Sequence, residues 1–222
     1  MTRFRVVFPS FLLLISLCAA AQQPAAPAAS EPQRKTSEPY TGDLSIFDSP
    51  GRAERLQINR VMDILGITPG KSAADIGAGS GWFTVRAAKR VGLAGQVYAL
   101  DINPDAVEHI SARAKKEQLP NVKTILSKPD DPMLPANSVD AVLLLKAYHE
   151  VADPIALLRN LRPALKSDAK LGVIDRNGNG ENHGVESDVV IREAKQAGYT
   201  LAGQYDFVKD GMDYFLVFTP TK

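Results

Sequence analysis

The feature that most constrains this chain is an apolar segment that ends in a turn with three glycines. Residues 73–83 read Ala-Ala-Asp-Ile-Gly-Ala-Gly-Ser-Gly-Trp-Phe, with an acidic residue two places before the first glycine. Glycine lacks a Cβ, so backbone N–H groups at such a turn can approach a ligand closely as a helix begins. A second apolar segment ends in Asp101, whose carboxylate can accept hydrogen bonds from ribose hydroxyls. Together these features indicate a nucleoside-cofactor site in an α/β sheet.

The spacing of the glycines separates two classes of cofactor. A dinucleotide-binding turn reads Gly-x-Gly-x-x-Gly and faces a pyrophosphate. In this chain the glycines are Gly77, Gly79 and Gly81. Trp82 stands where the dinucleotide pattern has its third glycine, and Asp75 would repel a pyrophosphate but could hold an amino group. An NAD(P)-dependent oxidoreductase is therefore the less favoured alternative.

On these residues the chain resembles the class I S-adenosylmethionine-dependent methyltransferases, whose first motif reads acid-hydrophobic-Gly-x-Gly-x-Gly. The resemblance implies S-adenosylmethionine as the cofactor, with Asp101 on the ribose and Ile102 against the adenine. It also implies a role for Asp75 near the methionine amino group. The remaining cofactor contacts implied are Gly77, Gly79, Gly81 and, after the third strand, Asp130. For Asp130 a solvated loop position is an equal alternative, because Lys128 stands where the family often has an acid.

The order of apolar and polar segments predicts an α/β fold. The expected helices are 52–65, 81–91, 104–118, 154–165 and 186–197, and the expected strands are 72–76, 96–101, 122–126, 139–145, 170–175, 201–209 and 214–219. Alternating strands and helices favour a doubly wound, mainly parallel seven-stranded sheet, the Rossmann-like methyltransferase fold. Asp210-Gly211 is typical of a hairpin turn, so the sheet should close with a C-terminal antiparallel hairpin.

Residues 146–150, Lys-Ala-Tyr-His-Glu, follow the fourth strand, and the resemblance implies that they face the reactive end of the cofactor. His149 is the candidate general base, because an imidazole titrates near neutral pH. The alternative is a loop histidine bonded to backbone. Tyr148 is the second candidate catalytic residue, either shaping the pocket or lying over the sulfonium charge.

A metal centre is not expected from the sequence. Asp175-Arg176-Asn177 resembles the acidic end of the fifth strand in metal-dependent O-methyltransferases. The matching acid after the fourth strand is missing, because Leu145-Lys146 stands there. His183 is expected to be structural or exposed, and Arg55 to be a solvated helix residue rather than a ligand of the methionine carboxylate.

The charge balance favours a small-molecule partner. The chain has 26 basic and 25 acidic residues, so it offers no overall electrostatic attraction for nucleic acid. The Asn/Asp-Pro-Pro-aromatic motif of amino-group methyltransferases does not follow the fourth strand. We therefore expect a small-molecule methyl acceptor and leave the oligomeric state open. The alternative is an exported cofactor-binding protein without catalysis.

The N-terminus reads as a secretory signal. Arg3 and Arg5 precede an apolar run that is too short for a membrane span, and small residues lead to a cleavage site after Ala21. We expect export, with residues 1–21 as signal peptide, 22–39 as a disordered Pro/Ala-rich linker and 40–222 as the methyltransferase domain. No membrane span should remain after processing. Cys18, the single cysteine, leaves lipidation as an alternative.

Overall fold

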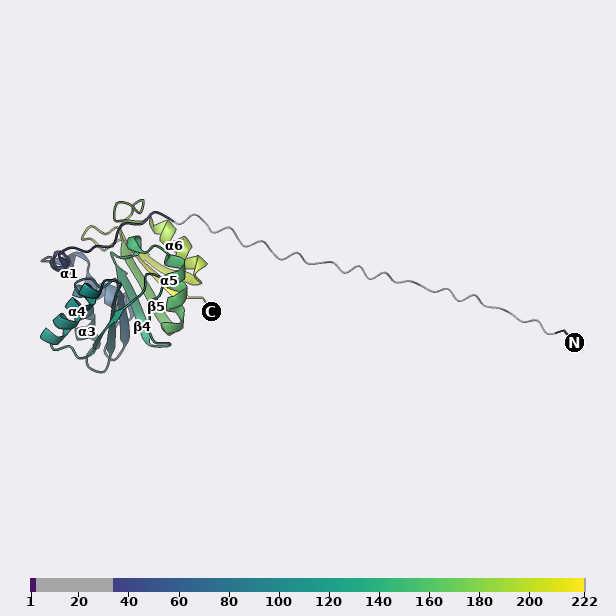
Figure 1. The fold of residues 1–222 in the computed structure, drawn as a ribbon, viewed down its shortest axis with the longest axis horizontal. Helices are drawn as coiled ribbons and strands as arrows, with labels where there is room; N and C mark the ends of the chain where they lie inside the picture. Colours follow the sequence, from purple (N-terminus) through teal and green to yellow (C-terminus); the bar gives the residue numbers. More distant parts are fainter. Residues whose placement is uncertain (3–33, 222) are drawn as a thin grey trace. The chain divides into compact units, whose positions relative to one another are not determined.

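The computed structural model describes residues 1–2 and 34–221 of the 222-residue chain. The expected signal peptide and most of the expected linker, residues 3–33, lie outside the described residues. Residues 34–221 form a sheet with helices on both faces (Figure 1).

The sheet has seven strands in the order β3-β2-β1-β4-β5-β7-β6. The strands are β1 (Ser72–Ile76), β2 (Gln96–Asp101), β3 (Val122–Leu126), β4 (Val139–Leu145), β5 (Leu165–Asp175), β6 (Tyr199–Tyr205) and β7 (Tyr214–Pro220). The first five in sheet order are parallel, and β7 is antiparallel to both of its neighbours. This arrangement confirms the predicted fold class. The strand order reverses between β1 and β4, so a ligand site is expected beyond their carboxyl ends.

Two helical layers cover the sheet because alternate strand residues point to opposite faces. On β1, Ala73 packs into one core cluster and Ala74 and Ile76 into the other. The first cluster holds residues of α2 (Ile58–Leu65) and α3 (Trp82–Val91), and the second holds residues of α5 (Pro154–Leu161) and α6 (Ser187–Gln196). Helix α4 (Pro104–Lys116) packs on β2 and β3, and the Asn103 side chain caps its first turn.

The expected helix 52–65 is two helices. Helix α1 covers Arg52–Arg55, and Gln57 then adopts a left-handed conformation with φ of 47° before α2 begins. The carbonyl of Arg55 accepts a hydrogen bond from the Lys209 backbone at 2.9 Å. A tertiary contact therefore takes the acceptor that a continuous helix would use, and the chain turns.

Three other expected boundaries are also wrong. Helix α5 ends at Leu161, where a 3₁₀ turn (Arg162–Ala164) containing Pro163 follows, and β5 begins at Leu165 rather than 170. Strand β6 ends at Tyr205, so the hairpin loop is longer than the Asp-Gly pair predicts. Val208 in this loop is buried in the first core cluster, and packing overrides the local strand pattern.

Residues 34–48, here called the N-terminal strap, belong to the folded unit. The strap ends in a 3₁₀ helix (Leu44–Asp48), and its first residues contact the loop after β4. Arg34 donates to the carbonyl of Tyr148 at 2.7 Å and pairs with Glu193 at 3.0 Å. Residues 34–39, assigned to the linker from composition, are thus bonded to the domain.

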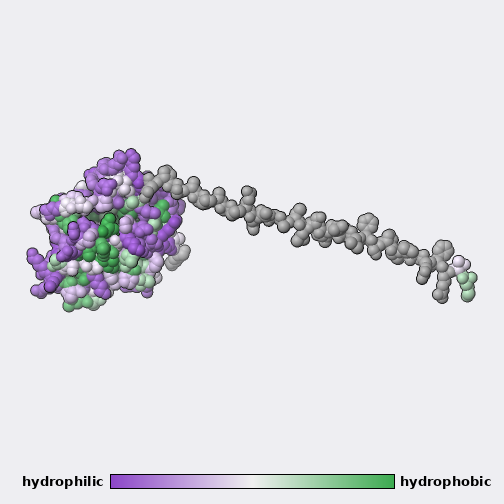
Figure 2. Space-filling view, viewed as in Figure 1, coloured by the Kyte–Doolittle hydropathy of each residue, from purple (hydrophilic) through white to green (hydrophobic). Residues whose placement is uncertain are grey.

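The described surface is mainly polar. Figure 2 shows hydrophilic residues over much of the visible face, with apolar residues in a narrower band between them. Within residues 1–2 and 34–221, no helix has the length and apolar character that crossing a membrane requires.

Candidate functional site

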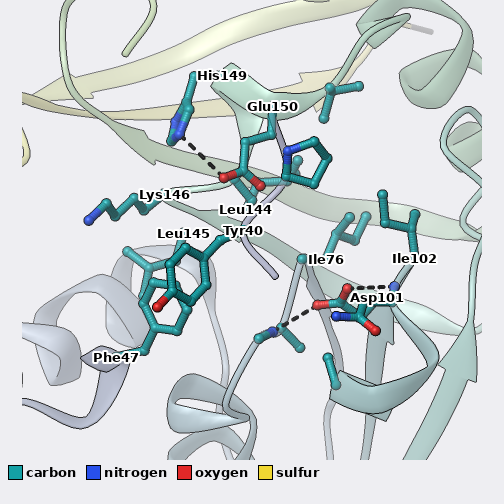
Figure 3. Close-up of a pocket in the computed structure, with 18 of the residues that line it drawn as sticks. Tyr40, Phe47, Ile76, Asp101, Ile102, Leu144, Leu145, Lys146, His149 and Glu150 are labelled. Carbon is teal, nitrogen blue, oxygen red and sulfur yellow. Dashed lines mark hydrogen bonds and ion pairs between the residues drawn. The ribbon is translucent and has the colours of Figure 1, made fainter. Parts of the chain in front are cut away.

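A cavity of about 950 Å³ lies beyond the carboxyl ends of the central strands. Its walls come from the turn after β1, the tips of β2 and β4, the loop after β5 and the strap. Figure 3 shows Asp101 and Ile102 at one side of this cavity and His149 and Glu150 at another, with Tyr40 and Phe47 from the strap. The strand topology has therefore brought together segments that are far apart in sequence.

The glycine turn is fixed by its own backbone. The N–H groups of Gly77 and Ala78 both donate to the Leu100 carbonyl, at 2.9 and 3.0 Å. Gly77 has a φ of +71°, and a Cβ there would lie 2.6 Å from the Cβ of Ala147. Only glycine lets the turn after β1 and the loop after β4 approach this closely.

Asp101 is held rigidly at the tip of β2. One carboxylate oxygen accepts from the Gly79 N–H at 2.9 Å, and the other accepts from the Asn103 N–H at 3.0 Å (Figure 3). Each oxygen has further lone pairs, and the residue lines the cavity beside half-exposed Ile102. The structure thus presents a preoriented carboxylate and an apolar side chain where a ribose and an adenine are expected.

Asp75 lies deeper, in the floor of the glycine turn. Its carboxylate accepts a 2.6 Å hydrogen bond from the Thr84 hydroxyl, and the residue is 2 % exposed. Burial raises the pKa of Asp75 to about 6, although the Thr84 hydrogen bonds and the nearby Arg52 charge act in the opposite direction. Asp75 borders the cavity, so its expected role near an amino group remains a prediction.

Arg52 is a cavity residue that sequence reasoning missed. Its guanidinium pairs with Asp210 at 3.0 Å, donates to the Phe47 carbonyl at 2.6 Å and lies 4.6 Å from the centre of the Trp82 ring. Burial lowers the pKa of Arg52, and Asp210 is the main group that opposes this shift. Arg55 is exposed, as expected, and it is also paired with Asp210 of the hairpin loop.

His149 is buried and oriented by a carboxylate. Its Nδ1 lies 2.9 Å from one oxygen of Asp175 and 3.0 Å from the other, and its backbone N–H donates to the same carboxylate at 3.1 Å. Asp175 also accepts from the Arg176 N–H at 2.9 Å. An acceptor of this kind favours the tautomer with the proton on Nδ1, which leaves the Nε2 lone pair on the cavity side.

Two further ionisable side chains lie beside this nitrogen. The Glu150 carboxylate is 3.7 Å from His149 Nε2 (Figure 3), and the His149 and His183 rings meet edge to face at 5.7 Å between centres. Burial raises the pKa of Glu150 to about 7, with smaller upward contributions from Asp101 and Asp175 and a downward one from His149. His183 is exposed, as expected from sequence, and it also lines the cavity.

Three predicted site residues are not in the cavity wall. Tyr148 is fully buried in the second core cluster, and its hydroxyl donates to Glu193 at 2.9 Å. Gly81 is the N-cap residue before α3, and a Cβ there would press against Ile110 at 3.2 Å. Asp130 is exposed, whereas its neighbour Pro129 is the residue that lines the cavity. The structure thus places Tyr148 and Gly81 in packing positions and Asp130 at the surface.

Residues 73–168 match a protein-family model described as a methyltransferase domain. Curated relatives include a 2-phytyl-1,4-naphtoquinone methyltransferase of Trichormus variabilis, 32% identical over 50% of this chain and 48% of the relative. The nocamycin O-methyltransferase of Saccharothrix syringae is 30% identical over 58% of this chain and 46% of the relative. The chain spans about half the length of the curated relatives it matches.

Solved structures share the fold. A SAM dependent methyltransferase from Aquifex aeolicus has a TM-score of 0.72 and 24% identity, over 80% of this chain and 98% of that one. The [4+2]-cyclase SpnF has a TM-score of 0.66 and 16% identity, over 86% of this chain and 89% of that one. The predicted fold is confirmed, residues 73–168 match the methyltransferase-domain model, and the activity has to be argued from the site.

Proposed function

We propose that this chain, whose residues 73–168 belong to the methyltransferase-domain family, transfers a methyl group from S-adenosylmethionine to a small organic acceptor. The family implies this cofactor, and the carboxylate of Asp101 is the observation that carries the assignment. Two backbone N–H groups, from Gly79 and Asn103, fix it at the edge of the cavity.

The residues present fit this cofactor. A Cβ at Gly77 would collide with Ala147, so glycine at this position lets the turn line the cavity with backbone alone. Asp101 supplies acceptors for two ribose hydroxyls, and Ile102 supplies an apolar surface for the base. Bound S-adenosylmethionine supplies an activated methyl group, so the acceptor forms a bond to the methyl carbon as the methyl–sulfur bond breaks.

The chain's own contribution is to position the reactants and to manage the acceptor's proton. Orienting two reactants in one cavity lowers the barrier by up to about 7–11 kcal/mol. At the acceptor end, Asp175 holds His149 so that the Nε2 lone pair lies at the cavity wall. An acceptor that loses a proton on methylation would give that proton to His149 Nε2, which acts as the general base.

The names of several relatives support an acceptor with an ionisable reacting atom. They include a demethylmenaquinone methyltransferase of Geobacillus, 28% identical over 50% of this chain, besides the naphthoquinone and nocamycin enzymes. We infer that the acceptor here is likewise a small molecule whose reacting oxygen or carbon carries an acidic proton. Nearly balanced charge, +1 overall, is consistent with such a partner.

The experiment is a calorimetric titration of the purified chain with S-adenosylmethionine, S-adenosylhomocysteine and NAD. The wild-type chain should bind the first two and not NAD. Asp101→Ala should weaken binding at least ten- to a hundredfold, because each charge-assisted hydrogen bond is worth roughly 1.5–3 kcal/mol. Asp168→Ala, which removes an exposed carboxylate of β5 outside the cavity, should leave the affinity unchanged.

Two results would contradict the proposal. One is NAD binding without S-adenosylmethionine binding, and the other is a folded Asp101→Ala variant with wild-type affinity. Methyl transfer is tested separately, by following a labelled methyl group from the cofactor into small-molecule extracts. Binding without any transfer would support the alternative of a cofactor-binding protein that does not catalyse.

A further inference from the structure

His149, Glu150 and His183 form a cluster of which the methyl-transfer scheme uses only His149. Each offers one ligand atom, and these atoms all lie within 4.8 Å of one another. His149 and Glu150 come from the 3₁₀ turn after β4 (Tyr148–Glu150), and His183 comes from the loop after β5. Two imidazoles and one carboxylate at one point are a donor set typical of a transition-metal site.

The orientation of His149 matches that of a metal ligand. A metal-binding histidine almost always donates its other ring N–H to a carboxylate or carbonyl, which fixes the tautomer. Here the Nδ1 of His149 lies 2.9 Å from a carboxylate oxygen of Asp175, which can accept its proton in a hydrogen bond. The other ring nitrogen, Nε2, lies 3.7 Å from a carboxylate oxygen of Glu150. The His149 side chain is 1 % exposed, so its direction is set by packing as well as by Asp175.

His183 is held in place through its backbone. Its N–H donates to the Ser37 hydroxyl of the strap at 2.8 Å, and its carbonyl accepts from Arg176 at 3.0 Å. Ser37 in turn donates its backbone N–H to the His149 carbonyl at 3.2 Å. One strap residue therefore bridges the two segments that carry the cluster.

We propose that His149 Nε2, a Glu150 carboxylate oxygen and a His183 ring nitrogen bind one zinc ion at the acceptor end of the cavity. Four-coordinate zinc with three protein ligands has one open position. With zinc bound, Nε2 is a ligand and no longer a base, and the open position would instead bind and acidify an acceptor oxygen. This role for the open position rests on the proposed function, whereas zinc binding itself does not.

The separations allow such a site with small side-chain movements. Ligand atoms about 2.0–2.2 Å from a tetrahedral zinc ion lie roughly 3.3–3.5 Å from one another. The His149–Glu150 separation of 3.7 Å is already close to this value. The three ligand atoms lie at most 4.8 Å apart, so the widest pair would have to come closer by about 1.5 Å to bind one ion. Exposed His183 can make this approach by rotation of its side chain.

The test uses zinc itself, added to the full, untagged chain in competition with a chromophoric chelator. We expect one zinc ion per chain, and Mg²⁺ should not displace it, because Mg²⁺ prefers oxygen ligands. His149→Ala, Glu150→Gln and His183→Ala should each weaken zinc binding at least about tenfold, since even changes to outer partners of metal ligands cost 10–100-fold. Asp175→Asn, which changes the outer partner of His149, should weaken zinc binding about 10- to 100-fold.

The chain provides a matched control. It has three histidines, and the third, His109, is exposed on α4. His109→Ala should bind zinc as the wild type does. Cys18, the one cysteine, is replaced by serine throughout so that no thiolate competes for the metal. Circular dichroism checks that each variant is folded, and the visible absorption of bound Co²⁺ reports four-coordinate geometry.

Failure of this inference is distinguishable from failure of the proposed function. A folded wild-type chain that binds no zinc, or a His183→Ala variant with unchanged zinc affinity, would overturn the zinc site. Titration of the same chains with S-adenosylmethionine then shows whether the cofactor site stands. Asp101→Ala should lose the cofactor and keep zinc, whereas His183→Ala should lose zinc and keep the cofactor.

Discussion

Asp75 is a carboxylate that the glycine turn buries at a cost. Its pKa in the folded chain is about 6, above its ordinary value of 3.8, mainly because of burial. The folded state therefore holds this proton more tightly than the unfolded state does. The contribution of the protonated Asp75 carboxyl group to the free energy of unfolding is complete below about pH 4 and is lost as the pH rises through 6.

We therefore expect the Asp75→Asn variant to gain stability relative to the wild type as the pH rises. The asparagine keeps an acceptor for the Thr84 hydroxyl and has no charge to bury. Urea unfolding without cofactor at pH 5 and pH 7.5 should show the difference in unfolding free energy growing by about 1–2 kcal/mol. An equal difference at both pH values would show that Asp75 titrates normally in the folded chain.

Single residues could be assigned from sequence where a local motif fixes their position. Asp101 is such a residue, because a strand tip after a glycine turn has one geometry in this fold. Glu150 and His183 could not be assigned, since only the packing of the loop after β5 brings His183 to the β4 turn. Tyr148 lies in the core while His149 lines the cavity, because neighbours on a 3₁₀ turn point in different directions, and the sequence does not reveal which of the two faces the cavity.

At the scale of elements, the strap is the part that sequence patterns did not reveal. It has little apolar periodicity, and contacts to distant residues hold it. Asp48, at the end of its 3₁₀ helix, pairs with Arg113 of α4 at 2.9 Å, and the Ser80 hydroxyl approaches the same carboxylate at 3.3 Å. Composition assigns residues 34–39 to a linker because their own partners, such as Glu193 for Arg34, also lie far away in the sequence.

Loss of the Arg113 contact should loosen the strap while the sheet stays intact. In Arg113→Ala, we expect the backbone amides of residues 34–48 to exchange hydrogen severalfold faster. The change in global stability should be about 1 kcal/mol or less, because partly exposed ion pairs contribute little. Hydrogen exchange followed by mass spectrometry measures the exchange rate of the strap amides, and urea unfolding measures the global stability.

Lys89→Ala is the control for this prediction. It removes an exposed pair with Glu117, the same acid that Arg113 also contacts, and does not touch the strap. Exchange in residues 34–48 should match that of the wild type. Equal exchange in the Arg113 and Lys89 variants would show that other contacts, such as those of Arg34, hold the strap alone.

For the whole molecule, the sheet could be predicted almost completely and the boundaries could not. Continuous apolar runs such as 139–145 identify parallel strands, and the C-terminal hairpin distinguishes this fold from a dinucleotide-binding one. The break between α1 and α2 depends on the Arg55 carbonyl meeting Lys209, a contact between the two ends of the domain. No local pattern contains that information.

Export is also a property of the whole chain, and we propose it from the N-terminal sequence. Arg3 and Arg5, the apolar run and Ala19–Ala21 lead to the expectation that Gln22 begins the mature protein. Fractionation of the native host followed by N-terminal sequencing tests it. A cytoplasmic chain that still begins at Met1 would contradict the proposal, and an acyl group on Cys18 would establish the lipoprotein alternative.

The bridge made by Ser37 has a mechanical consequence. Ser37 connects the His149 carbonyl to the His183 amide, and it lies three residues after Arg34, where the described part of the domain begins. A pulling force on the N-terminal side of Arg34 would therefore load these hydrogen bonds before it reached any strand of the sheet. Tension at that end of the chain would load the Arg34 contacts with Tyr148 and Glu193 first and would then act between the two histidines, at the acceptor end of the cavity.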